Sequence, residues 1–291
     1  MSGERVPPIA YLLPLTAYRS PLPGVAVRAV YGIVVREFVR FARQRGRALS
    51  SIARPFIWLI FAGAGFATVF AGGGEIDYRR YMAPGLLGMV VMFGSLLASL
   101  STVTDRDAGV LRMLLVAPIR RRTITLGKAL GATGLGTAQA LVVAVILLPA
   151  VRLWPGGAGM MLALAALVVS SLALGALGLV LAATMRSIEN FAGVMNFVVF
   201  PMLFLSGALY PVRRLGPALR ALVYVNPLAY GVDLLKHALL AQWTGAGYGG
   251  ELPVLLDFAA LAAFAMAGLT VAARLIAREG GVARAAFRER G

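Results

Sequence analysis

Six long apolar runs confine the charged residues of this sequence to short clusters, and no other feature limits the fold as strongly. Five of the runs contain no Asp, Glu, Lys or Arg, and the sixth contains only Asp257. A helix needs about 20 residues to cross the hydrocarbon of a bilayer, because each residue advances it by about 1.5 Å. The runs therefore predict an all-α integral membrane protein with six spans, at residues 55–71, 82–103, 129–151, 160–185, 191–210 and 253–273.

Composition supports a membrane protein over the other classes that the charge suggests. Only 14% of the 291 residues are charged, against about a quarter in soluble domains. A net charge of +16 would favour a nucleic-acid partner in a soluble protein, but here it predicts a basic cytoplasmic face and no nucleic acid. The chain has no cysteine, which excludes disulfides and thiolate metal sites, and its one histidine, His237, excludes clusters of several histidines.

The distribution of Lys and Arg predicts the orientation in the membrane. With the N-terminus inside, 21 of the 28 cationic residues fall in cytoplasmic segments and 7 in outer segments. This bias predicts both termini in the cytoplasm of a multi-pass protein of the bacterial inner membrane. Residues 1–26 are rich in proline without a continuous apolar core, so a cytoplasmic tail is expected there and not a cleavable signal peptide. Residues 27–278 would form the membrane domain, and 279–291 a basic cytoplasmic tail.

An amphipathic helix is predicted just before the first span, at residues 27–47. Apolar residues recur there every three or four positions, and Arg36, Arg40 and Arg43 repeat at the same spacing on the other side. Such a helix is expected to lie in the headgroup plane with its arginines toward anionic lipid. An ordinary soluble helix is the weaker alternative, because a membrane span follows at once.

Two polar segments between spans carry further helical patterns. In the first, Asp105 and Asp107 suit a helix N-terminus, Leu111 and Leu114 form an apolar stripe, and Pro118 ends the helix before a basic cluster. This pattern suits docking onto a cytosolic partner or onto the lipid surface. The second segment is predicted to hold short helices at 215–224 and 227–242, which re-enter the outer leaflet between spans five and six.

Small and polar residues inside the spans predict packing more readily than chemistry. The GxxxG pair Gly127 and Gly131 allows close helix contact within the bundle or with a second copy, and the pattern leaves both open. Asp257 is expected at the outer interface, so the interior carries almost no ionisable group, which argues against an ion-coupled carrier. The polar residues that remain are candidates for pathway contacts or interhelical hydrogen bonds: Gln139, Asn196 and Ser206.

The sequence contains no complete ATP-binding motif. Gly127-Lys128 suggests a phosphate loop, but Ala129 stands where Ser or Thr is needed and no glycine lies five residues before Gly127. The chain itself is therefore expected to bind no cofactor.

The two polar segments resemble the ABC-2 family of transporter permeases, in particular the drug-resistance and nodulation-factor export type. The first match comprises Asp107, Gly109, Leu111, Leu114, Pro118, Arg120–Arg122 and Gly127-Lys128. The second comprises Phe204-Leu205-Ser206-Gly207, Tyr210-Pro211, Asn226-Pro227-Leu228, Tyr230 and Asp233. The resemblance extends over about residues 27–278, nearly the whole chain.

The resemblance implies the permease subunit of an ATP-driven exporter of an amphipathic or lipid-linked substrate. Two copies of the membrane domain would pair, each docked on a separate ABC ATPase subunit that binds ATP and Mg²⁺, with residues 27–47 along the membrane lipid. The expected coupling residues are Asp107, Gly109, Leu111, Leu114 and Pro118. Asn226, Pro227 and Tyr230 would form an outer gate. A membrane scaffold and an ATP-independent carrier or channel are the alternatives.

Overall fold

The computed structural model describes residues 23–70, 77–116, 119–185, 187–242 and 249–288, and within them the chain is helical without strands. The first six helices are α1 (Pro23–Arg43), α2 (Arg45–Phe70), α3 (Tyr78–Ala98), α4 (Leu100–Asp107), α5 (Val110–Val116) and α6 (Arg121–Ala150). The rest are α7 (Gly157–Thr184), α8 (Ile188–Phe204), the 3₁₀ helix η2 (Val212–Arg214), α9 (Pro217–Val223), α10 (Pro227–Leu239) and α11 (Val254–Arg288).

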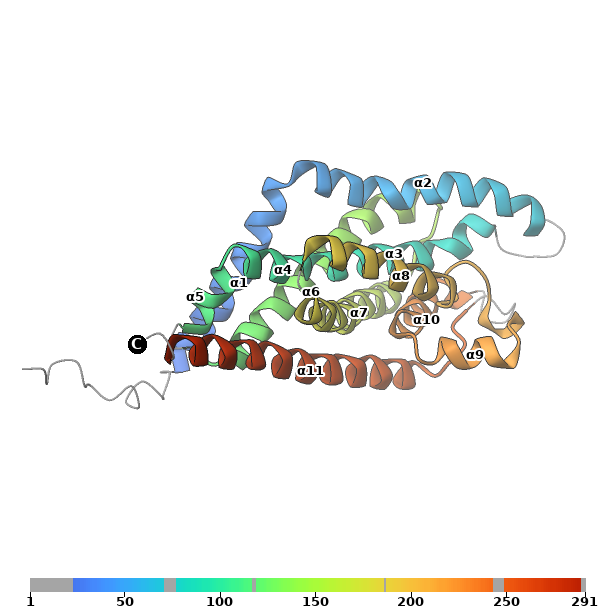
Figure 1. Cartoon of the computed structure of the whole chain (residues 1–291). Helices are drawn as coiled ribbons and strands as arrows, with labels where there is room; N and C mark the ends of the chain where they lie inside the picture. The colour runs from blue at the N-terminus through green and yellow to red at the C-terminus, as the bar shows by residue number, and fades with distance from the viewer. Residues whose placement is uncertain (1–22, 71–76, 117–118, 186, 243–248, 289–291) are drawn as a thin grey trace, which may run out of the picture.

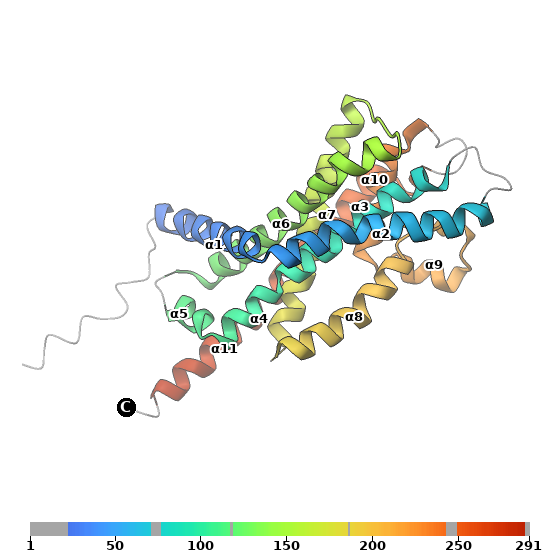
Figure 2. The same ribbon diagram turned by 90° about the horizontal axis from the view of Figure 1, so that it is seen from above.

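Helix α7 occupies the middle of an elongated bundle. It packs against α3, α6, α10 and α11, and Figure 1 shows it end-on between α3 and α11, with α2 along the opposite flank from α11. Seen from above, α1 leaves the bundle sideways near α5, and α9 lies at the far end (Figure 2). The bundle therefore has two distinct ends, one built around α4 and α5 and the other around α9 and α10.

Four helices in the described part of the chain are long and apolar enough to cross a membrane. They are Tyr78–Asp107, Arg121–Ala150, Gly157–Thr184 and Val254–Ala277. The apolar helix α8 is shorter, and the first predicted span falls on α2. The all-α membrane class is thus confirmed, while the count of six spans and the orientation stay predictions.

The helices do not share the limits of the predicted segments, and the limits of the membrane spans themselves stay predictions. The amphipathic helix, expected to end at Arg47, ends at Arg43, and α2 begins at Arg45 and continues through Pro55. Helix α6 begins at Arg121 and not at Ala129. Helix α8 ends at Phe204, before the predicted limit of Tyr210, and α11 runs through Arg288 into the segment expected to be a tail.

The glycine stripe of α6 packs against α1 of the same chain. A Cβ atom added to Gly127 would lie 3.0 Å from Ile33, one on Gly131 2.9 Å from Glu37, and one on Gly134 2.9 Å from the ring of Phe38. Such contacts leave no room for side chains and bring the two helix backbones together. The sequence left open whether Gly127 and Gly131 contact a helix of the same bundle or a second copy. The structure shows that this GxxxG pair packs within the bundle.

Candidate functional site

Five charged side chains from three helices meet at the α4–α5 end of the bundle, and we call them the arginine cluster. They are Arg36, Glu37 and Arg40 on α1, Asp105 on α4 and Lys128 on α6. Asp105 stands at the centre and has no exposed surface. Arg36 binds it with both guanidinium nitrogens, with Nη1 3.0 Å from Oδ2 and Nη2 2.5 Å from Oδ1. Arg40 Nη2 donates to Oδ1 at 2.6 Å.

Lys128 closes the cluster from the α6 side. Its buried Nζ donates to Glu37 Oε1 at 2.7 Å and to Ser101 Oγ at 3.1 Å, and it also bonds to Asp105 Oδ2. All three Nζ protons therefore have acceptors, which a buried ammonium requires. The cluster locks the orientation of α1, α4 and α6, because each charge depends on partners from the other helices.

One prediction for these residues is wrong, and another gains a contact that it did not foresee. Asp105 and Asp107 lie in the last turn of α4 and not at a helix N-terminus. Arg36 and Arg40, expected to face anionic lipid, bind Asp105 across the α1–α4 contact, and their lipid contact stays a prediction. The hydrogen bond to Asp105 raises the pKa of the Arg36 guanidinium, against the effect of its partial burial. Arg43 is exposed at the end of α1, so its predicted lipid contact stays a prediction.

Arg106, the neighbour of Asp105, binds the end of the central helix. Its guanidinium donates to the carbonyl oxygens of Ala182 at 3.2 Å and Ala183 at 3.3 Å, and to that of Met185. The last carbonyls of a helix lack intrahelical donors and carry partial negative charge, which a cation stabilises. Two consecutive residues of α4 thus connect it to α1, α6 and α7.

The predicted coupling residues surround the turn between α4 and α5. Asp107 is exposed, Gly109 forms the turn, and Leu111 in the first turn of α5 is buried. Leu114 is half-buried, and Pro118 lies outside the described residues. Met113 on the same helix is 74% exposed, so α5 presents an apolar side chain away from the bundle.

Gly109 requires a conformation that other residues rarely adopt. Its φ is +72°, and a Cβ atom at this position would meet nothing within 4 Å. We expect Gly109→Ala to lower the free energy of unfolding by about 1–2 kcal/mol, because an L-residue is strained at positive φ. SDS titration of the purified protein in mixed micelles measures this change. Gly193→Ala, at an open helical position in α8, should instead be neutral or stabilising; equal losses in both variants would contradict the expectation.

At the other end of the bundle, the predicted gate residues fix the start of α10. Asn226 caps this helix by accepting from the Leu228 amide at 3.0 Å, and its Nδ2 donates to the carbonyl of Met202 in α8 at 2.7 Å. Pro227 occupies the first helical position, which needs no amide donor. Tyr230 donates its hydroxyl to the Tyr224 carbonyl at 2.7 Å. The structure thus brings the three residues together as a rigid junction, while a gating role stays a prediction.

Helix α10 is buried almost all round although it carries charges. Asp233 and Lys236 are buried together with the apolar residues of this helix. Lys236 Nζ donates to the Tyr81 hydroxyl at 3.1 Å, and burial lowers the pKa of Lys236, although nearby Asp233 and Glu251 act to raise it. A cavity of about 180 Å³ lies beside Asp233 and Lys236 and is also lined by Arg213.

The polar candidates for a pathway do not converge in the structure. Gln139 is buried on α6 and lines a cavity of about 100 Å³ near the arginine cluster. Ser206 lines the cavity beside α10, where it donates to the Leu203 carbonyl at 2.7 Å and accepts from the Ala208 amide at 3.2 Å. Asn196 is exposed on α8. Ser206 therefore stabilises a local turn, and the pathway roles of all three stay predictions.

The expectation of an interior almost free of ionisable groups is wrong. Asp257 is completely buried in the first turn of α11, and Asp105 and Lys128 are buried as well, while the predicted place of Asp257 at the outer interface stays a prediction. Asp233 and His237 of α10 lie beside Asp257, and the potential ligand atoms of the three residues are within 4.8 Å of one another. Among the described residues, these three form the group whose donor types fit a metal ion.

Sequence reasoning missed Asp105, Glu37 and Lys128 as a cluster. Arg36 and Arg40 at i, i+4 gave a signal, since two cations on one helix face can grip one carboxylate. The acid that they bind lies 69 positions away from Arg36, and Lys128 entered the sequence analysis only through the Gly127-Lys128 pair, without a charged partner.

Comparisons with known proteins agree on one family. A family model described as ABC-2 type transporter matches residues 28–240. Nodulation protein J of Neorhizobium galegae is 26% identical over 200 residues, covering 67% of this chain and 74% of that protein. The "Probable multidrug ABC transporter permease YbhR" of Escherichia coli (strain K12) is 30% identical over 168 residues, covering 57% of this chain and 45% of that protein. The matched range includes the arginine cluster and α10 and ends before α11.

Proposed function

The chain belongs to the ABC-2 type transporter family, and from this premise we propose that it is the membrane subunit of an ATP-driven exporter. A separate ABC ATPase subunit would bind ATP and Mg²⁺ and supply the energy. Similarity to a protein named as a probable multidrug ABC transporter permease supports a permease that is separate from its ATPase. The chain is thus a transport permease, and its ATP-driven, outward action is the proposal.

The arginine cluster is the observation that carries the mechanism. Asp105 and Arg106 connect α4 to α1, α6 and α7, and the short helix α5 follows after one turn. A partner that pushes on α5 would move α4, and the ion pairs would transmit this displacement to the other helices. The partner can drive such a change only if it binds α5 differently in its two nucleotide states.

The further parts of the proposal concern assembly and cargo. We propose that two copies pair in a bacterial inner membrane, with both termini in the cytoplasm, and that the cargo is amphipathic or lipid-linked. Similarity to Nodulation protein J agrees with the resemblance carried by the two polar segments, from which this export type is taken. An apolar groove of about 460 Å³, bounded by Leu177 of α7, Met202 of α8 and Phe264 of α11, offers an acyl chain a matching surface.

A change on the exposed face of α5 tests the proposed partner. We expect Met113→Glu to reduce co-purification of the ATPase by at least about tenfold, since a desolvated charge in an interface costs more than about 1.4 kcal/mol. The measurement is capture of a co-expressed ATPase by the tagged permease in detergent, together with the ATPase turnover of the complex.

The matched control is Trp154→Glu, because Trp154 is 75% exposed in the connection between α6 and α7 at the opposite end of α6. This variant should capture the ATPase normally. Undiminished capture by Met113→Glu would refute α5 as the docking helix, and a wild-type chain that captures no ATPase would refute the proposed exporter.

Buried Asp257 gives the carrier alternative a specific basis, since ion-coupled carriers use buried carboxylates. Reconstitution into vesicles distinguishes an ATP-driven exporter from an ion-coupled carrier. The purified permease alone, in vesicles with an imposed ion gradient, should move no solute uphill if an ATPase drives it. Uphill transport under those conditions would establish a carrier.

A further inference from the structure

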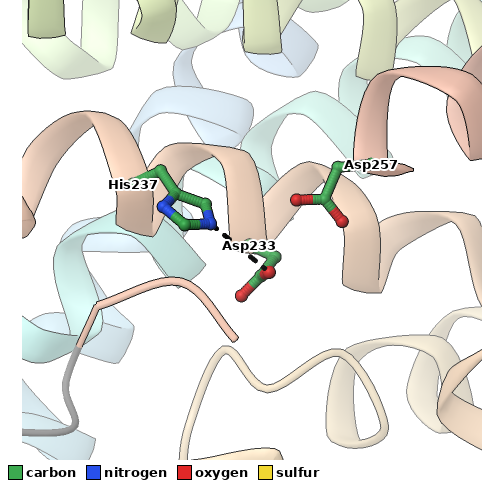
Figure 3. A group of neighbouring side chains, drawn as sticks. All are labelled: Asp233, His237 and Asp257. Carbon is green, nitrogen blue, oxygen red and sulfur yellow. Dashed lines mark ion pairs between the residues drawn. The ribbon is translucent and has the colours of Figure 1, made fainter. Parts of the chain in front are cut away.

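Three potential metal ligands converge where α10 meets the first turn of α11. Asp233 and His237 stand four residues apart on α10 and therefore on one helix face. Asp257 reaches the same point from α11, and Figure 3 shows its carboxylate turned toward the other two side chains. The ligand atoms lie within 4.8 Å of one another.

Asp257 is the residue that points to a ligand. It has no exposed surface, and neither carboxylate oxygen has a hydrogen-bond donor among the described residues. A buried carboxylate without a partner is strongly unfavourable, and here a second carboxylate, Asp233, stands beside it. The adjacent cation, Lys236, is directed to the Tyr81 hydroxyl at 3.1 Å. A positive charge held between the two carboxylates would stabilise this arrangement.

The surrounding backbone holds Asp233 and His237 in place. Both oxygens of Asp233 accept from the Glu251 amide, at 2.8 and 3.0 Å, and Oδ2 also accepts from the Leu252 amide at 2.8 Å. His237 Nε2 lies 2.7 Å from the Leu252 carbonyl oxygen and 4.0 Å from Asp233 Oδ2. Hydrogen bonds such as those to Asp233 orient the ligands of protein metal sites, while the Nε2 contact places the imidazole of His237 beside them.

We propose that Asp233, His237 and Asp257 bind one divalent transition-metal ion of the Zn²⁺ or Mn²⁺ class. An imidazole with two carboxylates matches these ions better than Ca²⁺ or Mg²⁺, which prefer oxygen alone. Bonds of about 2.1 Å place neighbouring ligands of a tetrahedral ion about 3.4 Å apart, so small side-chain rotations complete the site. The ion takes the place of the Nε2 proton, and the nearby Leu252 carbonyl supplies a fourth ligand. One ion thereby fastens the start of α11 to α10.

Metal binding by the permease alone tests the proposal independently of transport and of any ATPase. The full chain in detergent is stripped with EDTA, dialysed, and titrated with ZnCl₂ or MnCl₂ by calorimetry, with the bound metal quantified after gel filtration. We expect one ion per chain and a higher thermal unfolding midpoint with the metal. Substitution with Co²⁺ should give the visible absorption bands of a tetrahedral or five-coordinate site.

Two variants separate a specific site from adventitious binding. Asp257→Asn and His237→Gln should each weaken the affinity by more than about 100-fold, since loss of a direct ligand exceeds the loss of a supporting hydrogen bond. Asp257→Asn removes the unpaired charge, so without metal it should be at least as stable as the wild-type chain. The control is Glu189→Gln, which removes an exposed acid on α8 and should bind metal normally.

Three results would overturn the proposal. One is the absence of stoichiometric binding by the wild-type chain. Another is binding that Asp257→Asn or His237→Gln retains, which would place the metal elsewhere. The last is a stability that changes with pH but not with added metal, in a way that Asp257→Asn abolishes. That result would show that the carboxylates of Asp233 and Asp257 share a proton and bind no metal.

Discussion

Asp105→Ala is expected to lower the free energy of unfolding by about 3–5 kcal/mol, the range for removing one partner of a buried ion pair. The variant leaves Lys128, which is 2% exposed, with only Glu37 as a charged partner, and it removes the carboxylate that two arginines of α1 bind. The desolvation of these cations remains while most of the attraction that offsets it is lost. SDS titration in mixed micelles measures the change.

Asp107→Ala provides the matched control for this prediction. Asp107 stands two residues further along the same helix and is exposed, so its removal should change stability by no more than about 0.5 kcal/mol. In the assembled transporter, Asp105→Ala should also uncouple ATPase turnover from transport. Similar stabilities for the two variants would show that the arginine cluster contributes little to the fold.

Gly85→Leu is expected to lower the free energy of unfolding by about 3 kcal/mol or to prevent folding, because overpacking of a filled core forces the backbone to shift. A Cβ atom on Gly85 of α3 would lie 2.5 Å from the carbonyl oxygen of Ala208 and 2.6 Å from its Cα atom. Backbone atoms cannot rotate away as a side chain can. Ala208 lies in the turn at residues 205–211, and Tyr81 also holds this turn in place, because its hydroxyl donates to the Gly207 carbonyl at 3.3 Å.

The same substitution at an open position is the control for Gly85→Leu. Gly193 of α8 has no atom within 4 Å of a Cβ position, and leucine is well tolerated on an open face of an apolar helix. Gly193→Leu should therefore insert and unfold like the wild-type chain. A stable, fully folded Gly85→Leu variant would show that the contact between α3 and the 205–211 turn is looser than described.

The helices could be predicted because apolar runs of this length have few alternatives in lipid. Their ends could not, since Arg, Lys and Thr are acceptable helix residues and the polar segments permitted several limits. Helix α6 begins eight residues before Ala129, the predicted start of the third span. There Arg121 is fixed by the carbonyl of Ala277 from α11, a contact between segments far apart in the chain.

The charged interior was harder to predict than the fold. Asp105, Lys128 and Asp257 each lie in or beside an apolar run, where hydropathy alone places charges at an interface. Their burial depends on partners from other helices, such as the arginines of α1 for Asp105. Local patterns do not encode such pairings, so burial of these residues becomes visible only in the assembled bundle.

The close contact between α1 and the glycines of α6 has a consequence for assembly. Gly127 and Gly131 are already covered by Ile33 and Glu37 of the same polypeptide, so the one GxxxG pair identified in the sequence is not free to join two protomers. The proposed pairing of two copies would then use another surface, and we expect one that contains Phe61 of α2 or Phe197 of α8, which are 75% and 79% exposed. Attempts to separate a dimer should accordingly target these phenylalanines, because glycine substitutions in α6 would damage each monomer first.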